Sequence, residues 1–325
     1  MSLHPLLEAI ASRLLQGETP LASREEAEAL GQLPRSLNPD LFALAGLARA
    51  RFAKPVFTCA IVNAKSGRCP EDCAFCAQSA RHRTDAPVYP LADADTLFRK
   101  AEAAAACGAA RFGIVTSGTA LSDRDLDSLC ASAEALRARI DIALCGSLGM
   151  LNRERARRLR QAGFTSYHHN LETARSHFPA ICTTHAYEED LASLACARAE
   201  GLRVCSCGIF GLGESWAQRA ELLETLAEAH VDSLAVNFLM PVPGTRLEGR
   251  PQLEAWEALR CVALARLTNP ARDVVVCGGR LATLGAVDSW VLAAGANGLM
   301  TGDYLTTRGS GFESDQRMLQ SLGLR

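Results

Sequence analysis

From about residue 50 onward, short runs of β-branched and other apolar residues alternate with longer amphipathic segments. Alternating strands and helices favour a parallel α/β sheet covered by helices. Eight strand-like runs are present, at 56–62, 111–116, 141–145, 166–171, 203–209, 233–239, 273–277 and 298–301. Eight such units with short connections predict a closed (β/α)8 barrel, the TIM-type fold. The alternative, an open doubly wound sheet, is not excluded by periodicity alone.

Helix ends are also recognisable in the sequence. Ser122, Asn152 and Ser215 each precede a helical segment and predict N-caps. Residues 1–50 contain several prolines and predict an N-terminal helical extension, whereas residues 51–325 predict the barrel. No linker or second domain is apparent between these two parts.

The charges of the 325-residue chain are nearly balanced, with 34 Lys plus Arg against 36 Asp plus Glu. This balance, without a block of one sign, gives no reason to expect nucleic-acid or anionic-membrane binding, so we expect a small-molecule partner. The first 20 residues have amphipathic helix spacing and do not resemble a secretory signal. No apolar stretch approaches the ~20 residues that a membrane span requires. We therefore expect a cytoplasmic protein.

Thirteen cysteines without a secretory signal suggest metal binding and not a disulfide framework. Cys69, Cys73 and Cys76 follow the first predicted strand in a C-x3-C-x2-C pattern. Three thiolates on a short loop can hold three irons of a [4Fe-4S] cluster, which leaves the fourth iron open to a small molecule. The alternatives are chance clustering and a structural zinc knuckle that includes His82, although a closed zinc site would need a better-spaced fourth ligand.

This loop, with an aromatic residue before its third cysteine, resembles the radical S-adenosylmethionine (SAM) superfamily. Within that superfamily, the run from residue 63 to residue 79, NAKSGRCPEDCAFCAQS, resembles the biotin synthase family. The similarity covers roughly residues 50–325. It continues at residues 167–173, 183–184, 204–214, 237, 243–245, 278–280 and 293–297.

The resemblance implies conversion of dethiobiotin to biotin. In that family, SAM binds the open iron, a 5′-deoxyadenosyl radical abstracts hydrogen, and an auxiliary iron–sulfur cluster supplies sulfur. The resemblance further implies an electron-donor protein such as flavodoxin or ferredoxin, and a homodimer. One alternative is a radical SAM enzyme of the same subgroup without sulfur insertion, either a carbon-skeleton mutase or a hydrogenase-cofactor maturase. Another is a noncatalytic iron–sulfur carrier.

Several polar and glycine residues at predicted strand ends gain roles only from this resemblance, because such residues also commonly cap helices or close turns. The family pattern places Phe75 and the turn from Gly208 to Gly211 near the adenine. It places Asn170 and Glu172 at the ribose or substrate, Thr116, Ser117 and Gly118 at the SAM amino group, and Asn237 at the substrate. Where the family often has an arginine for the SAM carboxylate, this chain has His185 and Asp190.

The familiar auxiliary [2Fe-2S] cluster is held by three cysteines and an arginine, of which only Cys145 and Cys205 have counterparts here. Gly113 and Val275 occupy the other two positions and cannot bind iron. Since side chains two apart on a strand share a face, Cys207 and Cys277 are predicted to face the lumen instead.

The four thiols of Cys145, Cys205, Cys207 and Cys277 would suit a four-iron auxiliary cluster better than a two-iron one. The alternative is that these thiols pack as small apolar side chains. Packing is our interpretation of the remaining cysteines, which are Cys59, Cys107, Cys130, Cys182, Cys196 and Cys261.

Overall fold

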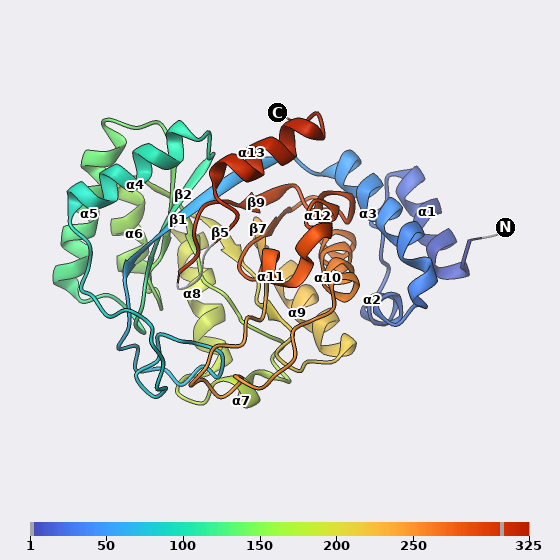
Figure 1. The fold of residues 1–325 in the computed structure, drawn as a ribbon, viewed down its shortest axis with the longest axis horizontal. Coiled ribbons are helices and arrows are strands. Elements are labelled where there is room, and N and C mark those ends of the chain that lie inside the picture. The colour runs from blue at the N-terminus through green and yellow to red at the C-terminus, as the bar shows by residue number, and fades with distance from the viewer. Residues whose placement is uncertain (1–2, 306–308, 325) are drawn as a thin grey trace.

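The strands of the computed structural model form one closed parallel barrel surrounded by helices (Figure 1). The structure describes residues 3–305 and 309–324. Its strands are β1 (Phe57–Lys65), β2 (Arg111–Thr116), β3 (Ala143–Ser147), β4 (Phe164–His168), β5 (Arg203–Ser206), β6 (Ile209–Phe210), β7 (Ser233–Phe238), β8 (Asp273–Val276) and β9 (Gly298–Met300). The sheet closes because β1 pairs with both β2 and β9, and β5 pairs with β7. The predicted barrel is confirmed.

The fifth predicted strand, 203–209, is split into β5 and β6, and both parts pair with β7. Cys207 and Gly208 lie between them, where the chain turns towards the segment after β4. A Cβ atom at Gly208 would lie 2.2 Å from the carbonyl oxygen of Glu172, so this close backbone approach requires glycine. Because the strand is interrupted here, the rule that side chains two residues apart share a face does not apply to Cys205 and Cys207.

The helices that follow the strands begin where the sequence predicted. The side chains of Ser122, Asn152 and Ser215 each accept a hydrogen bond from a backbone N–H of the first turn. Within the described residues, no helix combines the length and apolar character needed to cross a membrane. The helices are α4 (Ala94–Ala106), α5 (Asp123–Arg137), α6 (Arg153–Gln161), α7 (Phe178–Ile181), α8 (Tyr187–Ala199), α9 (Trp216–Glu228), α10 (Ala255–Thr268), α11 (Arg280–Leu284), η2 (Gly285–Val287), α12 (Trp290–Ala293) and α13 (Phe312–Ser321).

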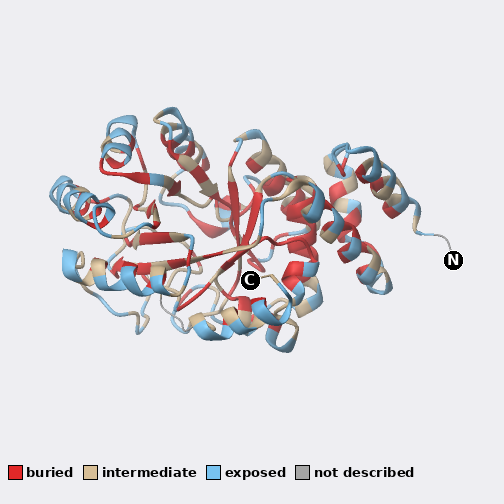
Figure 2. Cartoon of the chain, turned by 90° about the horizontal axis from the view of Figure 1, so that it is seen from above, coloured by how far each residue is buried: buried red, intermediate tan, exposed pale blue. Residues whose placement is uncertain are grey.

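The N-terminal extension packs on one side of the barrel, against α9, α10 and α12 (Figures 1 and 2). It comprises α1 (Pro5–Gln16), α2 (Arg24–Gly31), η1 (Arg35–Leu37) and α3 (Asn38–Phe52). Every residue of α10 from 258 to 267 is buried, because the barrel covers one face and the extension covers the other. Within this contact, Arg260 donates hydrogen bonds to Asn38 Oδ1 at 2.6 Å and to the carbonyl oxygens of Gly31 and Leu33 at 2.9 and 2.6 Å.

The C-terminal helix α13 is attached to the barrel by a buried arginine. The side chain of Arg280 has no exposed surface and forms ion pairs of 2.7 Å with both Asp288 and Asp315. Asp315 belongs to α13, whereas Arg280 begins α11 directly after the end of β8. The pairing therefore holds the last helix beside the carboxyl ends of the strands, where TIM-type barrels carry their active sites.

Candidate active site

A cavity of about 640 Å³ occupies the barrel interior, within the range typical of small-molecule sites. Most of the predicted site residues lie on its wall, whereas Cys207, Gly208 and Gly211 are not part of the lining. The predicted residues that line it are Cys69, Cys73, Phe75, Cys76, Thr116, Ser117, Gly118, Cys145, Asn170, Glu172, Cys205, Asn237 and Cys277.

Cys69, Cys73 and Cys76 lie on the loop after β1 and all line the cavity. The loop is held in a tight turn, in which Cys76 N–H donates to Cys73 O and Cys69 N–H to Gln78 O, both at 3.0 Å. Burial raises the pKa of Cys76 to about 11. Three half-buried thiols around one open space suit a metal cluster, because binding to iron offsets the cost of forming thiolates there.

Cys182, which the sequence analysis interprets as a packing residue, belongs to the main apolar core and also lies on the cavity wall beside this loop. Its Sγ lies 3.8 Å from Sγ of Cys73. The ligand atoms of Glu71, Cys182 and His185 lie within 4.8 Å of one another. His185 Nδ1 is 2.8 Å from Glu71 Oε2 and 3.4 Å from Cys182 Sγ, so its imidazole joins this group to the cluster loop.

Asp190 lies in the stretch where the family resemblance leads one to expect an arginine, and the structure explains how a carboxylate is accommodated there. Its two oxygens lie 2.7 Å from His169 Nε2 and 3.3 Å from His185 Nε2. Burial opposes its ionisation, but these hydrogen bonds outweigh burial and lower the pKa of Asp190. Asp190 thus orients two imidazoles that line the cavity.

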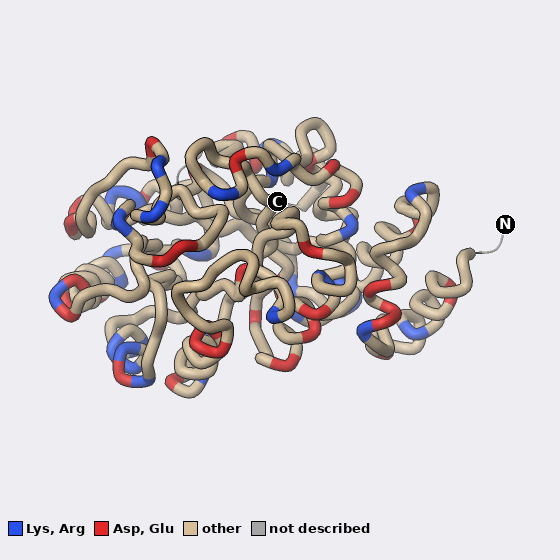
Figure 3. The backbone as a smooth tube through the Cα atoms, turned by 90° about the horizontal axis from the view of Figure 1, so that it is seen from below, with Lys and Arg blue, Asp and Glu red and all other residues tan. Residues whose placement is uncertain are grey.

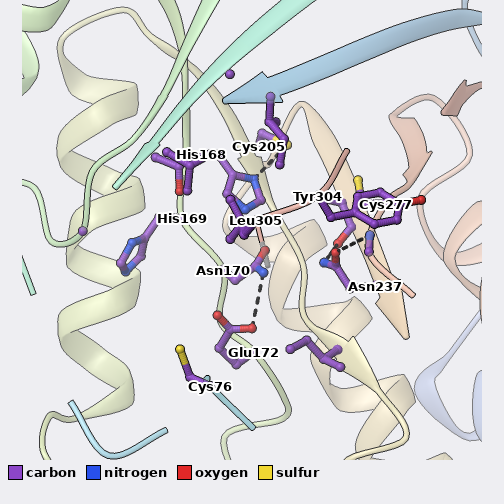
Figure 4. Close-up of a pocket in the computed structure, with 18 of the residues that line it drawn as sticks. Cys76, His168, His169, Asn170, Glu172, Cys205, Asn237, Cys277, Tyr304 and Leu305 are labelled. Atoms are coloured by element: carbon purple, nitrogen blue, oxygen red, sulfur yellow. Dashed lines mark hydrogen bonds between the residues drawn. The ribbon is translucent and has the colours of Figure 1, made fainter. Parts of the chain in front are cut away.

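Asn170 and Glu172 project into the cavity after β4 (Figure 4). Asn170 Nδ2 donates to Glu172 Oε2 at 3.3 Å, and its Oδ1 accepts from the N–H of Cys207 at 3.2 Å. Glu172 has a φ of 62°, a left-handed conformation that is uncommon for a residue other than glycine. Burial raises the pKa of the Glu172 carboxyl to about 8. The pair therefore presents a neutral donor and acceptor surface at neutral pH.

The predicted residues after β2 form another polar part of the wall. Ser117 Oγ donates to the carbonyl oxygen of Gly67 at 2.8 Å, which ties this turn to the cluster loop. Gly118 has a φ of 111°, which favours glycine. Thr116 Oγ1 is buried without a hydrogen-bond partner among the described residues. A buried orphan hydroxyl on a cavity wall suits a ligand that supplies the missing partner.

Phe75 and Asn237 line the cavity in different ways. Phe75 packs beside a small apolar cluster that includes Ile181 and Leu239. Asn237 bonds internally, because its Nδ2 donates to the carbonyl oxygen of Ala235 at 2.9 Å and its Oδ1 accepts from the N–H of Gly278 at 2.9 Å. Asn237 therefore joins β7 to the turn after β8 in addition to facing the cavity.

Four cysteines line the cavity at a distance from the cluster loop, and three of them, Cys145, Cys205 and Cys277, belong to the predicted auxiliary set. The four are Cys59, Cys145, Cys205 and Cys277. Cys59 faces the interior from β1 and belongs to a small apolar cluster with Cys205 and Cys277. In Figure 4, Cys76 and Cys205 lie at opposite ends of the view, with Glu172, Asn170 and His168 between them.

Cys207 lies elsewhere, which corrects the expectation that it shares a face with Cys205. It is fully buried in the main apolar core, and this burial raises the pKa of its thiol, with a smaller contribution from Cys261 of α10. The reason is the break in the fifth strand, since β5 ends at Ser206 and the N–H of Cys207 bonds to Asn170. Gly113 and Val275 do line the cavity, as expected, but neither offers a metal ligand.

Two further cavity residues, His168 and Arg111, had no assigned role in the sequence. His168 Nδ1 lies 3.3 Å from Cys205 Sγ. Arg111 pairs with the buried Asp273 at 2.5 Å, and its guanidinium lies 4.2 Å from the centre of the Phe57 ring. Strand alternation could have indicated Arg111 and Cys59, which face each other across the β1–β2 register.

Comparisons with known proteins agree with this geometry. The family model of the radical SAM superfamily matches residues 64–226, and that of the Biotin and Thiamin Synthesis associated domain matches residues 235–325. A biotin synthase of Nitratidesulfovibrio vulgaris strain DP4 is 56% identical over 302 residues, which cover 93% of this chain and 84% of the relative. A biotin synthase of Syntrophus aciditrophicus is 46% identical over 322 residues, 99% of each chain.

Solved structures similar to this one share its fold at low sequence identity. A methylornithine synthase superposes with a TM-score of 0.81 at 17% identity and covers 97% of this chain and 96% of its own. The FeFe-hydrogenase maturase of Carboxydothermus hydrogenoformans superposes with a TM-score of 0.80 at 15% identity, over 97% of this chain and 78% of its own. These two matches support the barrel fold alone.

Proposed function

Because the chain belongs to the biotin synthase family of the radical SAM superfamily, we propose that it converts dethiobiotin to biotin. The observation that carries this proposal is the presence of two groups of cysteines on one cavity wall, with polar side chains between them. One group suits a cluster that binds SAM, and the other suits a sulfur source. A substrate between the two would be accessible to both.

Cys69, Cys73 and Cys76 would hold the [4Fe-4S] cluster. When bound, this cluster supplies the electron that cleaves SAM to methionine and a 5′-deoxyadenosyl radical, which takes hydrogen from the substrate. The three thiols leave one iron for the amino and carboxylate groups of SAM. The orphan hydroxyl of Thr116, on the wall beside this loop, is available to the amino group.

For the auxiliary cluster we propose the ligands Cys59, Cys145, Cys205 and Cys277. All four line the cavity, whereas Cys207 does not, and this supports Cys59 as the fourth ligand. Four thiolates suit a four-iron cluster better than the two-iron cluster of the familiar enzymes. The guanidinium of Arg111 faces the same space and would offset negative charge there.

The protein's own residues would bind and orient the substrates. Asn170 and the protonated carboxyl of Glu172 provide hydrogen bonds for the ribose or for dethiobiotin, and Phe75 provides an apolar surface for the adenine. Asn237, Gly208 and Gly211 would act by shaping the turns that border this space. The mainly apolar wall would disfavour water near reactive intermediates.

The function is tested by anaerobic turnover of the reconstituted protein with dethiobiotin, SAM and a reductant. We expect both biotin and 5′-deoxyadenosine. Formation of 5′-deoxyadenosine without biotin would contradict sulfur insertion and favour a radical SAM enzyme that rearranges its substrate. Absence of both products from protein that carries its iron would contradict radical SAM chemistry altogether.

The auxiliary ligand set is tested by comparing Cys59→Ala with Cys207→Ala. We expect about eight irons per chain in the parent and in Cys207→Ala, and about four in Cys59→Ala. Cys261→Ala is a matched control, because Cys261 is also a fully buried thiol and is not part of the cavity lining. Equal iron content in Cys59→Ala and Cys207→Ala would contradict the proposed set.

The remaining proposals rest on family resemblance. They are a homodimer, an electron-donor protein of the flavodoxin or ferredoxin type, and a cytoplasmic location. Light scattering of the purified protein tests the first, and reduction by each type of donor tests the second. Fractionation of cells that produce the protein tests the third.

A further inference from the structure

The cavity ends, at the amino ends of the strands, on a single layer of side chains that we call the floor. The floor consists of the first residues of six strands, Phe57, Arg111, Ala143, Arg203, Ser233 and Asp273. Because side chains two residues apart on a strand share a face, the floor lies directly beneath the layer that contains Cys59, Cys145 and Cys205. These three proposed auxiliary ligands are therefore one layer away from this end of the barrel.

The composition of the floor differs from that of an ordinary barrel layer. Layers inside TIM-type barrels are usually filled by bulky branched side chains. Here, Ala143 and Ser233 are small, whereas Arg111, Arg203 and Asp273 are charged. The floor is therefore closed by hydrogen bonds and ion pairs between a few side chains, and not by dense apolar packing.

The two arginines of the floor are held to different degrees. Arg111 donates to Asp273 Oδ2 at 2.5 Å and to Ser233 Oγ at 3.0 Å, and its guanidinium also lies over the ring of Phe57. Within residues 3–305 and 309–324, the guanidinium of Arg203 has one hydrogen-bond partner, the same oxygen of Asp273, at 3.2 Å. The side chain of Arg203 is 41% exposed, against 21% for Arg111. Since exposed ion pairs contribute little to stability, Arg203 is the side chain of the floor that moves most easily.

The cavity reaches solvent beside Arg203. Thr165, the second residue of β4, is exposed and lines the cavity, as Arg203 does. Ala143, on the adjacent strand β3, contributes only a methyl group to the same part of the wall. Movement of Arg203 away from Asp273 would therefore open a passage from solvent to Cys205, which lies one layer above it on β5.

A fixed cation of the floor faces the proposed auxiliary ligands. Burial raises the pKa of the thiols of Cys59, Cys145 and Cys205. At each of them the guanidinium of Arg111 opposes this rise. Cys59 and Arg111 are also direct partners in the pairing of β1 with β2. A small anion that passes the floor would thus find a guanidinium between solvent and these sulfur atoms.

The charges at the floor are balanced. The carboxylate of Asp273 is shared by Arg111 and Arg203, and Asp232, just before β7, accepts a hydrogen bond from the N–H of Val204 at 2.8 Å. Figure 3, which views the molecule from below relative to Figure 1, likewise shows Lys and Arg positions intermixed with Asp and Glu positions around the molecule. An anion is therefore not drawn in by a long-range field. It would be held by the remaining N–H groups of Arg203 once it reaches the floor.

We propose that the floor admits hydrosulfide to the auxiliary site, with Arg203 as the side chain that moves aside. The proposal rests on the proposed function, in which each biotin takes one sulfur atom from the auxiliary cluster and leaves a position to be refilled. Hydrosulfide carries sulfur at the oxidation level of a bridging sulfide. Its S–H bond breaks, the proton goes to solvent and bonds to iron form, so no electron is transferred. The mouth of the cavity, at the cluster loop, can stay occupied by SAM and dethiobiotin.

The test measures how fast isotopically labelled hydrosulfide enters the protein. Reconstituted protein first completes one turnover with dethiobiotin, SAM and a reductant, and is then freed of small molecules by anaerobic gel filtration. Labelled hydrosulfide is added with fresh SAM and dethiobiotin but without reductant, so that the mouth is occupied and no turnover takes place. Mass spectrometry of the acid-labile sulfide measures the uptake of label, which is a readout separate from activity.

Two variants of the floor should change the uptake in opposite directions. Arg203→Ala removes the movable side chain and should take up label severalfold faster than the parent, whereas Ala143→Leu narrows the passage and should take it up severalfold more slowly. Arg24→Ala is the matched control and should equal the parent. Arg24 is 38% exposed and pairs with Glu221 at 3.1 Å, so its removal makes the same change in net charge and breaks a similar ion pair away from the floor.

Alkylation of the metal-free protein by iodoacetamide is a second measurement, which needs no cluster. In Arg203→Ala, the thiols of Cys145 and Cys205 should react severalfold faster than in the parent. The thiols of Cys69 and Cys76, at the mouth, should react at the parent rate. Peptide mass spectrometry follows each cysteine separately. If a floor variant fails to bind iron, this measurement decides whether the floor opens.

Equal uptake of label in the parent, Arg203→Ala and Ala143→Leu would overturn the proposal. So would uptake that SAM and dethiobiotin prevent, because it would assign entry to the mouth, and so would an alkylation rate of Cys205 that does not respond to Arg203→Ala. Biotin formation in the first turnover depends on the proposed function and not on the floor. Its absence would contradict that function, whereas the alkylation rates would still decide whether the floor opens, so the two proposals can fail separately.

Discussion

His168 Nδ1 lies 3.3 Å from Sγ of Cys205, inside the cavity and next to the proposed auxiliary ligands. Burial lowers the pKa of His168 to about 4, so the imidazole is neutral at pH 7. A neutral ring can donate one N–H, and a metal-bound thiolate at this distance would accept it. His168 is thereby placed as a positioning residue for the ligand Cys205.

For His168→Ala, we expect a lower reduction potential of the auxiliary cluster and about tenfold less biotin, because a hydrogen bond to a ligand sulfur stabilises the reduced form. His168→Asn retains an N–H donor and should recover most of the potential. A redox titration monitored by electron paramagnetic resonance measures the reduction potential of the auxiliary cluster in each variant. An unchanged potential in the alanine variant would show that the contact has no influence on the cluster.

The raised pKa of Glu172 predicts a pH dependence of stability. The folded pKa is about 8 and the ordinary value is 4.5, so between these values the folded state holds a proton that the unfolded state has released. Stability therefore falls as the pH rises through this window, by at most about 1.4 kcal/mol per pH unit. Glu172→Gln should remove this slope. Urea unfolding of the metal-free parent and of metal-free Glu172→Gln, each at pH 5.5 and 7.5, measures how the free energy of unfolding changes with pH. An equal change in the two proteins would refute the prediction.

Cys182, 3.8 Å from Cys73, should not be a ligand of the SAM-binding cluster. Its sulfur lies among His185, Thr184 and Glu71, outside the C-x3-C-x2-C loop. We expect Cys182→Ala to bind as much iron as the parent, whereas Cys73→Ala should lose about four irons per chain. Iron analysis and visible absorption after reconstitution distinguish the two variants. Loss of iron in Cys182→Ala would add this residue to the ligand set.

Arg280→Met should destabilise the protein by about 3–5 kcal/mol, because it leaves the buried carboxylate of Asp315 and the partly buried carboxylate of Asp288 without their cation. The control is Arg317→Met, which removes an exposed ion pair to Glu313 and should cost below about 1 kcal/mol. Urea unfolding measures both. Limited proteolysis of Arg280→Met should release α13 first, and equal stability of the two variants would argue against the anchoring role.

The barrel was predictable because its signal is repeated eight times along the chain, and an error in one strand does not change the topology. Strand ends were less accurate, since β1 continues to Lys65 and β3 begins at Ala143, two residues later than predicted. Such ends depend on which neighbouring backbone is available for pairing. That information is not contained in the local sequence.

The auxiliary site was only partly predictable for a related reason. Counting two residues from Cys205 to Cys207 assumed an unbroken strand, but the approach of Glu172 to Gly208 breaks it. Strand alternation in β1 does turn Cys59 towards the barrel interior. Its place as a proposed auxiliary ligand becomes apparent only from the structure, in which β1 closes the barrel beside β9. Likewise, the pairing of Asp190 of α8 with two histidines depends on side chains from separate segments of the chain.

The contact between Arg260 and Asn38 also has a consequence for biosynthesis, because these residues are 222 positions apart in the chain. Ribosomes add roughly 5–20 residues per second, so the leading helices wait about 10–45 seconds before α10 is synthesised. Throughout this interval their apolar faces lack their final partner. This N-terminal extension is thus among the last segments to reach its native contacts, and a chaperone that shields it would raise the yield of correctly folded protein.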